Sequence, residues 1–236
     1  MSKGGLVLVP TPIGNLGDIT LRALEVLKSA TAVYAEDTRV TRKLFAHFGI
    51  TTPLSAFHQH NEHQITSRLV EKMLAGDTIV LVSDAGTPGI SDPAYLLVRE
   101  SIRNDIKVEC LPGPVALIPA LVASGFPCDR FVFEGFLPHK KGRQKRLLAL
   151  ASEERTIVLY ESPYRLRKLL EEVSNIFGPD REACVCRELS KLHETYHRGT
   201  VALLTEHFTK NEPKGEIVVV LAGKGAGKST GEDLEE

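Results

Sequence analysis

Carboxylates stand at the ends of strand-like apolar runs in this 236-residue sequence, at Glu36, Asp37, Asp84, Glu161 and Glu188. A positioned carboxylate can remove a proton during a reaction. Any one of these acids could instead cap a helix or form half of a salt bridge, and Asp84 could hold a ribose or an ammonium group. The acids become informative because loops suited to binding a ligand occur at the same strand ends.

Loops rich in Gly, Pro and small polar residues follow consecutive strand-like runs, at residues 10–18, 36–39, 83–93 and 111–117. Ligands of open α/β sheets bind outside the carboxyl ends of the strands, and Gly lets the main chain approach them closely. One such loop would indicate only a turn, whereas the whole set predicts a ligand cleft. None reads G-x-G-x-x-G, the phosphate-binding fingerprint of dinucleotide sites. An adenosine-bearing cofactor without phosphate, such as S-adenosyl-L-methionine, satisfies that condition.

The segment AGKGAGKST, residues 222–230, differs by one residue from a phosphate-binding P-loop. A working P-loop needs a helix after its GK[ST], because the helix N-terminus holds the phosphates. Only a short polar stretch follows Ser229, and the motif begins with Ala222 in place of Gly. We therefore interpret residues 224–236 as a disordered tail and predict no nucleotide site there.

Composition indicates an ordinary globular protein, with 42% hydrophobic and 25% charged residues and a net charge of −1. No apolar run approaches the ~20 residues that span a bilayer. The N-terminus runs directly into a strand-like pattern without signal-peptide architecture, so the cytoplasm is expected. The histidines of HQHNEHQ, residues 58–64, form only a loose metal pattern, and no metal is predicted. The four cysteines form no C-x-x-C pair and are expected to be buried, reduced thiols.

One stretch is locally basic: HKKGRQKR, residues 139–146, carries five cations and no acid. Two interpretations stay open from the residues alone. The stretch could be the solvated start of a helix, or it could contact a polyanion.

The pattern of apolar residues predicts an α/β protein with a mainly parallel N-terminal sheet and a mixed C-terminal sheet. Strands are expected at 6–10, 31–36, 78–83, 107–111, 131–136, 156–162, 182–189, 194–204 and 216–223. Helices are expected at 19–29, 39–47, 62–75, 93–104, 141–152 and 163–176, with another ending near Gly125. The last three strands have no predicted helix between them, which favours hairpins. The predicted domains are 1–115 and 116–223.

Longer motifs then become recognisable, among them PTPIGNLGDITLRAL, VSDAGTPGISDP, LPGPVAL, FEGFLPHKKGRQKRL and CRELSKLHETYHRGT. In this order, over about residues 5–223, the chain resembles the bacterial ribosomal RNA small subunit methyltransferase I family. The resemblance implies a tetrapyrrole methylase fold of two α/β domains, with S-adenosyl-L-methionine bound in the cleft between them. It also implies 2′-O-methylation of a cytidine in the decoding region of 16S rRNA in the 30S subunit, by a homodimer.

The resemblance also implies the site residues. Cofactor contacts are expected from Pro12, Gly14, Asn15, Asp84, Gly86, Thr87, Pro88, Pro112, Gly113, Pro114, Val115, Ala116, Tyr160, Gly215, Glu216 and Ile217. Catalytic roles are expected for Glu36, Asp37, Arg39, Glu161 and Lys191. RNA contacts are expected from Lys140, Lys141, Arg143, Lys145, Arg146 and Arg165, so the basic stretch now favours RNA.

The reaction so implied needs a base for the ribose 2′-hydroxyl, and Asp37 and Glu36 are the first candidates because they stand beside Arg39. Arg39, Arg165 or Lys191 would hold a neighbouring phosphate. Two alternatives remain: a methyltransferase of the same fold acting on a corrin or tetrapyrrole precursor, and a binding module without catalysis. The first should lack the basic stretch, and the second would not need acids beside a complete cofactor cleft.

Overall fold

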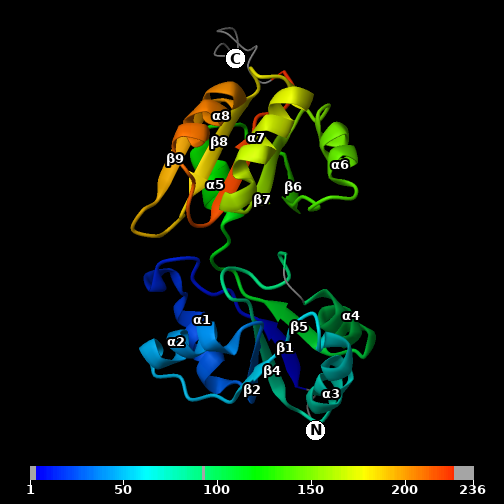
Figure 1. Ribbon diagram of the computed structural model, residues 1–236. Coiled ribbons are helices and arrows are strands. Elements are labelled where there is room, and N and C mark those ends of the chain that lie inside the picture. Colours follow the sequence, from blue (N-terminus) through cyan, green and yellow to red (C-terminus); the bar gives the residue numbers. More distant parts are fainter. Residues whose placement is uncertain (1–3, 92–93, 226–236) are drawn as a thin grey trace, which may run out of the picture. The chain divides into compact units, whose positions relative to one another are not determined.

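Figure 1 presents the computed structural model, which describes residues 4–91 and 94–225. Two compact units are distinguished along the chain, the first ending at Val115 and the second beginning at Ala116. Each unit has its own sheet and its own buried apolar core.

The first unit alternates strands and helices along the chain. Its elements are β1 (Gly5–Leu8), the 3₁₀ turn η1 (Leu16–Asp18), α1 (Leu21–Ser29), β2 (Ala32–Ala35), α2 (Thr38–Phe48), β3 (Leu54–Ala56), α3 (Glu62–Leu74), β4 (Thr78–Val82), α4 (Tyr95–Arg103) and β5 (Lys107–Cys110). The five strands lie in the order β3-β2-β4-β1-β5, and all adjacent pairs are parallel. Helices α1 and α2 cover one face of this sheet and α3 and α4 cover the other (Figure 1).

Parallel strands with helices on both faces bring every carboxyl end to one edge of the sheet, which decides where a ligand can bind. The strands are correspondingly apolar on both faces, as in the buried run Ile79–Val82 of β4. The loops 9–15, 36–37, 57–61, 83–91 and 111–115 all leave from that edge.

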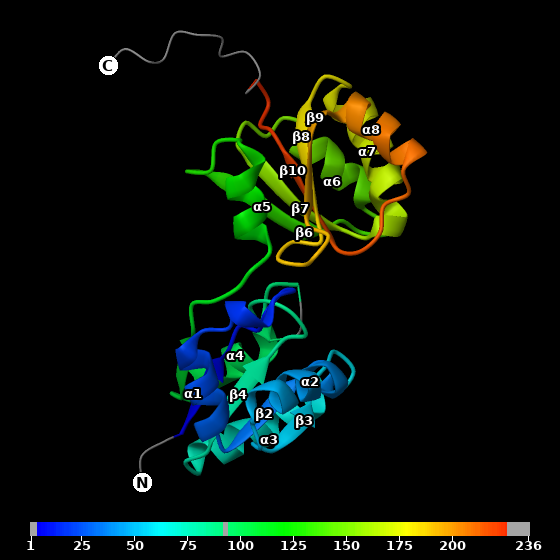
Figure 2. The ribbon, with the colours of Figure 1, turned by 90° about the vertical axis from the view of Figure 1, so that its left-hand side faces the viewer.

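The second unit has a mixed sheet. Its elements are α5 (Leu117–Ser124), β6 (Phe131–Phe136), α6 (Arg143–Leu150), β7 (Thr156–Glu161), α7 (Pro163–Phe177), β8 (Glu182–Arg187), β9 (Thr195–Thr200), α8 (Val201–Lys210) and β10 (Ile217–Leu221). The strand order is β6-β7-β10-β8-β9, with β6 and β7 parallel and the other adjacent pairs antiparallel. Helix α5 lies on one face, and α6, α7 and α8 lie on the other (Figure 2).

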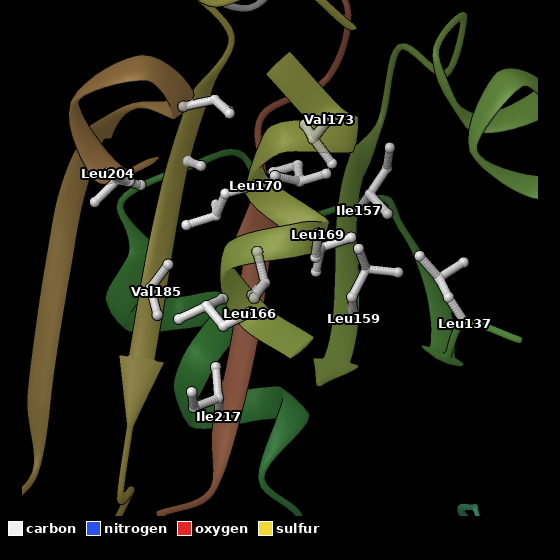
Figure 3. Close-up of a cluster of buried hydrophobic side chains, with 14 of the residues drawn as sticks. Leu137, Ile157, Leu159, Leu166, Leu169, Leu170, Val173, Val185, Leu204 and Ile217 are labelled. Carbon is white, nitrogen blue, oxygen red and sulfur yellow. The ribbon is translucent and has the colours of Figure 1, made fainter. Parts of the chain in front are cut away.

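Helix α7 provides the centre of the second core (Figure 3). Its Leu166, Leu169, Leu170 and Val173 repeat at helical spacing and are fully buried against the sheet. Strand β7 contributes Ile157 and Leu159 to the same cluster, alternating with residues that face the other way. The core therefore fixes α7, and with it the polar N-terminus of that helix, against the end of β7.

The predicted strand at 194–204 is wrong in its last four residues, 201–204. Strand β9 ends at Thr200, and α8 begins at Val201. The Thr200 side chain caps this helix by accepting a hydrogen bond from Leu203 N, and Val201, Leu204 and Phe208 bury the inner face. Only β8 and β9 therefore form the expected hairpin, because α8 precedes β10. The short β3 was missed altogether.

Other predictions are confirmed only in part. Cys184 and Cys186 are buried free thiols as predicted, whereas Cys110 and Cys128 are exposed. Of the predicted tail, residues 226–236 lie outside the described part of the chain, as does most of the P-loop-like segment. Within residues 4–91 and 94–225, the helices are all too short or too polar to cross a membrane.

Candidate active site

The loops that follow β1 and β4 are tied together by hydrogen bonds. Thr11 and Gly86 form an antiparallel bridge in which each N–H donates to the other carbonyl at 2.9 Å. Thr11 Oγ1 donates to Ser83 O at 3.1 Å, and Ser83 Oγ donates to Gly86 O at 2.9 Å. Both hydroxyl side chains are buried. The two loops are therefore held as one element at the carboxyl edge of the first sheet.

The loop after β5 joins the same element through a hydrogen bond and through a close contact at Gly113. Thr87 Oγ1 donates to Pro114 O at 3.0 Å. A Cβ on Gly113 would lie 2.7 Å from Pro10 Cβ, so only glycine fits there without displacement. Gly86 has φ +85°, in the left-handed region, and an added Cβ would lie 3.5 Å from Ile13. The first unit thus brings together the predicted cofactor loops 12–15, 84–88 and 112–115.

These loops suit a cofactor that is recognised mainly by the main chain. Gly14, Asn15, Pro112 and Gly113 are exposed, Gly86 and Pro88 are buried, and Pro12, Asp84, Thr87, Pro114, Val115 and Ala116 are half-buried. The Asn15 carboxamide is already used, since it accepts a hydrogen bond from Gly17 N at 2.9 Å. The main chain of such loops can approach a bound ligand closely. Because these loops lack a phosphate-binding helix turn, they fit S-adenosyl-L-methionine better than a nucleotide.

The acids of the second loop are fixed as well. Asp84 Oδ1 accepts the Asp37 N–H at 2.9 Å, which links the end of β2 to the loop after β4. Asp37 caps α2 by accepting Arg39 N at 2.8 Å, and the Arg39 guanidinium lies 2.5 Å from its other oxygen. The side-chain hydrogen bond from Arg39, with its backbone N–H, lowers the pKa of Asp37 to about 2. Asp37 is therefore a weak base, while its neighbour Glu36 is half-buried at the strand end.

In the second unit, strand pairing brings the remaining candidates to one edge of the mixed sheet. Ile217, the first residue of β10, pairs with Glu161 of β7 on one side and with Arg187 of β8 on the other. The antiparallel direction of β10 places its start beside the ends of β7 and β8. The predicted residues Tyr160 and Glu216 therefore lie at the same edge as the acids that end these strands.

Glu188 forms a compact ion-paired turn at this edge. Glu188 Oε1 accepts Glu216 N at 2.8 Å and Lys191 Nζ at 2.9 Å, and Lys191 Nζ also lies 3.3 Å from Glu216 Oε2. The hydrogen bond from Lys191 lowers the pKa of Glu188. Burial lowers the pKa of Lys191, but its carboxylate partners raise it on balance. Lys191 is therefore a cation here and cannot serve as a base near neutral pH.

The turn depends on Gly215 directly. Gly215 has φ +84°, and a Cβ added there would lie 2.3 Å from Glu188 Cδ. Glu188 itself takes a positive φ of 54°, which is unusual for a residue with a side chain. The predicted cofactor residues 215–217 are thus packed against Glu188.

Glu161 lies at the centre of a buried charge network. It is only 2% exposed, and it receives Arg143 Nη2 at 3.3 Å, Arg165 Nη2 at 2.8 Å and Ser162 N at 2.8 Å. Arg143 also donates to Glu172 at 2.7 Å. A buried carboxylate is tolerated only with such partners. Glu161 is therefore a structural anchor at the end of β7, and it is not placed to remove a proton.

This network corrects the prediction that Arg143 contacts RNA from the surface, because its side chain is 4% exposed and faces Glu161. Lys140, Lys141 and Lys145 are exposed, Arg146 pairs with Glu134, and Arg165 is half-buried. Arg165 Nη1 lies 2.9 Å from His139 Nδ1, which ties the basic loop to the start of α7. The basic stretch is thus partly a surface and partly an internal support.

Tyr160 stands among aromatic rings, with Phe133 at 5.0 Å and Phe136 at 5.6 Å between centroids. Burial raises the pKa of its phenol. Phe136 remains 53% exposed, so an aromatic surface lies next to the end of β7.

Sequence reasoning missed the burial of Arg143 and the support that Gly215 gives to Glu188. A charge run looks exposed in a sequence, and only the helical spacing of Arg143 with Leu147 and Leu150 indicates that it lies on the inner face of α6.

No cluster of His, Cys, Asp and Glu suited to a metal ion occurs among the described residues.

Known proteins are similar to this chain in sequence and in fold. The sequence profile of the family described as Tetrapyrrole (Corrin/Porphyrin) Methylases matches residues 5–205. The protein named ribosomal RNA small subunit methyltransferase I from a Synechocystis species is 52% identical over 93% of this chain and 79% of its own length. Its namesake from Thermotoga maritima is 46% identical, over 94% of this chain and 99% of its own length.

A solved structure has a similar fold. Uroporphyrin-III C-methyl transferase from Thermus thermophilus, complexed with S-adenyl homocysteine, aligns with a TM-score of 0.66. The alignment covers 93% of this chain and 97% of that chain, at 21% sequence identity.

Two glycine variants test the Glu188 turn. Gly215 and Gly125 share φ +84°, but nothing lies within 4 Å of a Cβ on Gly125. Gly125→Ala should cost about 1–2 kcal/mol of unfolding free energy for the left-handed backbone alone. Gly215→Ala should cost more, because the Glu188 carboxylate must also move. Urea unfolding of both variants measures the difference, and equal losses would show that Glu188 does not confine Gly215.

A second pair of variants tests the buried network. Arg143→Ala leaves Glu161 buried with one guanidinium fewer and should lower the unfolding free energy by about 3–5 kcal/mol. Lys145→Ala, two residues away on the exposed face of α6, should change it by less than about 0.5 kcal/mol. Urea unfolding compares them, and similar small effects would mean that Arg143 does not support Glu161.

Proposed function

We propose a function from one premise, that the chain belongs to the tetrapyrrole methylase family and, within it, to the ribosomal RNA small subunit methyltransferase I proteins. It is a methyltransferase that uses S-adenosyl-L-methionine. The substrate proposed for it is 16S rRNA in the 30S subunit, methylated on the ribose 2′-oxygen of a cytidine in the decoding region. The observation that carries this proposal is the 46–52% identity to proteins of that name over more than nine-tenths of the chain.

A tetrapyrrole precursor is the second candidate substrate, because the structural neighbour named above is a uroporphyrin-III C-methyl transferase. That likeness rests on 21% identity, which supports a common fold and no common substrate. The exposed lysines of the basic stretch further support a polyanion such as RNA. We propose that the enzyme works in the cytoplasm. We also propose that it is a homodimer, as the resemblance implies.

The proposed cofactor contacts are the loops 12–15, 84–88 and 112–116, together with Tyr160 and residues 215–217. Bound S-adenosyl-L-methionine supplies a methyl group on a sulfonium sulfur, which is already a good leaving group. The residues of the chain then have to orient the ribose oxygen and remove its proton. Orientation contributes roughly 7–11 kcal/mol in favourable cases, so it is the larger task.

The ion pairs described above assign the polar residues to different tasks. Asp37 has a pKa of about 2 and is bound to Arg39, which suits it to holding that guanidinium in place. Arg39 is 85% exposed, so it can still bind an RNA phosphate. Glu36 is then the better candidate for the base that receives the 2′-hydroxyl proton. Arg165 and Lys191 are proposed to bind neighbouring phosphates.

The substrate is tested with 30S subunits from a strain that lacks this methylation. The protein is incubated with tritiated S-adenosyl-L-methionine, and the rRNA is hydrolysed in alkali. A 2′-O-methyl group blocks alkaline cleavage at its own nucleotide, so the label should appear in a cytidine-containing dinucleotide from the decoding region. Naked 16S rRNA runs in parallel. Bound cofactor without labelled RNA, and label on a tetrapyrrole precursor, would contradict the proposal.

The acids are tested by single-turnover methylation under the same conditions. Glu36→Gln should slow transfer by about 10²–10⁴-fold, the usual contribution of a general base. Asp37→Asn should act mainly on the affinity for RNA, because it frees Arg39 from its partner. The reverse pattern, with slow transfer in Asp37→Asn alone, would make Asp37 the base.

A further inference from the structure

A pocket in the first unit is lined in part by the loop 83–91, whose residues 84–88 carry proposed cofactor contacts. Its volume is about 510 Å³, and its lining includes Gln59, Glu62, His63, Ser91, Tyr95 and Arg99. These residues belong to the starts of α3 and α4 and to the loops before them. Since α3 follows β3 and α4 follows β4, the pocket opens at the carboxyl edge of the sheet. Residues 92 and 93 lie outside the described part of the chain and are not included.

Tyr95 contributes an exposed aromatic ring to this pocket. It is the first residue of α4, and 73% of its surface is exposed. The Arg99 guanidinium lies over one face of the ring, with Cζ 5.4 Å from the centroid. Arg99 is itself paired with Glu100 at 3.3 Å. An exposed aromatic ring is a platform on which a flat group can stack.

The other polar side chains of the pocket can recognise a neutral ring better than a phosphate. The Gln59 carboxamide both donates and accepts hydrogen bonds, and the His63 imidazole can do the same. Glu62 adds a carboxylate, which accepts hydrogen bonds from exocyclic amino groups and repels a phosphate. The combination matches the hydrogen-bonding edge of a nucleobase.

We propose that this pocket binds an unpaired base of the RNA, stacked on Tyr95 and hydrogen-bonded to Gln59, Glu62 or His63. The inference rests on the proposed function and adds a specificity subsite to it. RNA is recognised in sequence mainly through unstacked bases, whose faces stack on aromatic side chains. The loop that forms one wall, at Ser91, continues directly from residues 84–88. A base bound here would therefore be a neighbour of the methylated nucleotide and would fix its register.

Steady-state methylation of 30S subunits tests the subsite. Tyr95→Leu should raise the KM for subunits about tenfold, within the range for loss of one base–aromatic stack, and should leave kcat nearly unchanged. Tyr95→Phe keeps the ring and should rescue the KM. An unchanged KM in the leucine variant, with normal labelling by the parent protein, would overturn this inference alone. Absence of RNA labelling by the parent protein would overturn the proposed function and the subsite with it.

Fluorescence tests the stack directly, because the chain contains no tryptophan. Tyr95→Trp should be quenched by a decoding-region RNA at concentrations that saturate binding, as judged by anisotropy of labelled RNA. Leu203→Trp, at a position 61% exposed on α8, is the matched control and should not respond. Equal responses would contradict stacking at Tyr95.

Weaker binding of Tyr95→Leu to 30S subunits but not to naked RNA would assign the pocket to a ribosomal protein and overturn the proposal.

Discussion

The buried carboxylate of Glu161 is the constraint around which the second unit is arranged. A charge that is 2% exposed must be balanced, and the balance comes from Arg143 of α6, Arg165 of α7 and the Ser162 amide. Helices that otherwise only cover a sheet are thereby fixed at one end of β7. Arg143, which looks like a surface group in the sequence, is consequently committed to support, whereas Lys140, Lys141 and Lys145 beside it remain exposed.

The same principle governs the smaller groups at the two sheet edges. Asp37 holds Arg39 and caps α2, while Glu188 holds Lys191 and the backbone of Glu216. In each case a carboxylate orients a cation and is thereby made a weaker base. Such pairs suit a reaction in which the chemistry resides in the methyl donor and the protein has to supply alignment.

Most of the fold follows from the sequence, because apolar periodicity separates strands from helices and Gly-Pro loops mark the strand ends. Helix α8 was missed because the β-branched residues Thr200 and Val201 continue the pattern of β9, and only the Thr200 cap reveals the change. The loops predicted to bind the cofactor could be picked out because each carries its own local signal in Gly and Pro, and the structure joins them by hydrogen bonds. The ion-pair network at Glu161 could not be predicted, because Arg143 lies 18 residues away in the sequence. Pairing between such distant side chains does not produce a recognisable spacing of residues.

The position of β10 has a consequence for biosynthesis. This strand is the central one of its sheet, yet it is encoded after all the others, at Ile217–Leu221. The first sheet is complete once β5 has left the ribosomal tunnel, so that unit can fold during translation. The second sheet cannot close until β10 has also emerged, because β7 and β8 each lack a neighbour before then. Until then two apolar strand edges stay unpaired in the nascent chain, and unpaired strand edges favour aggregation.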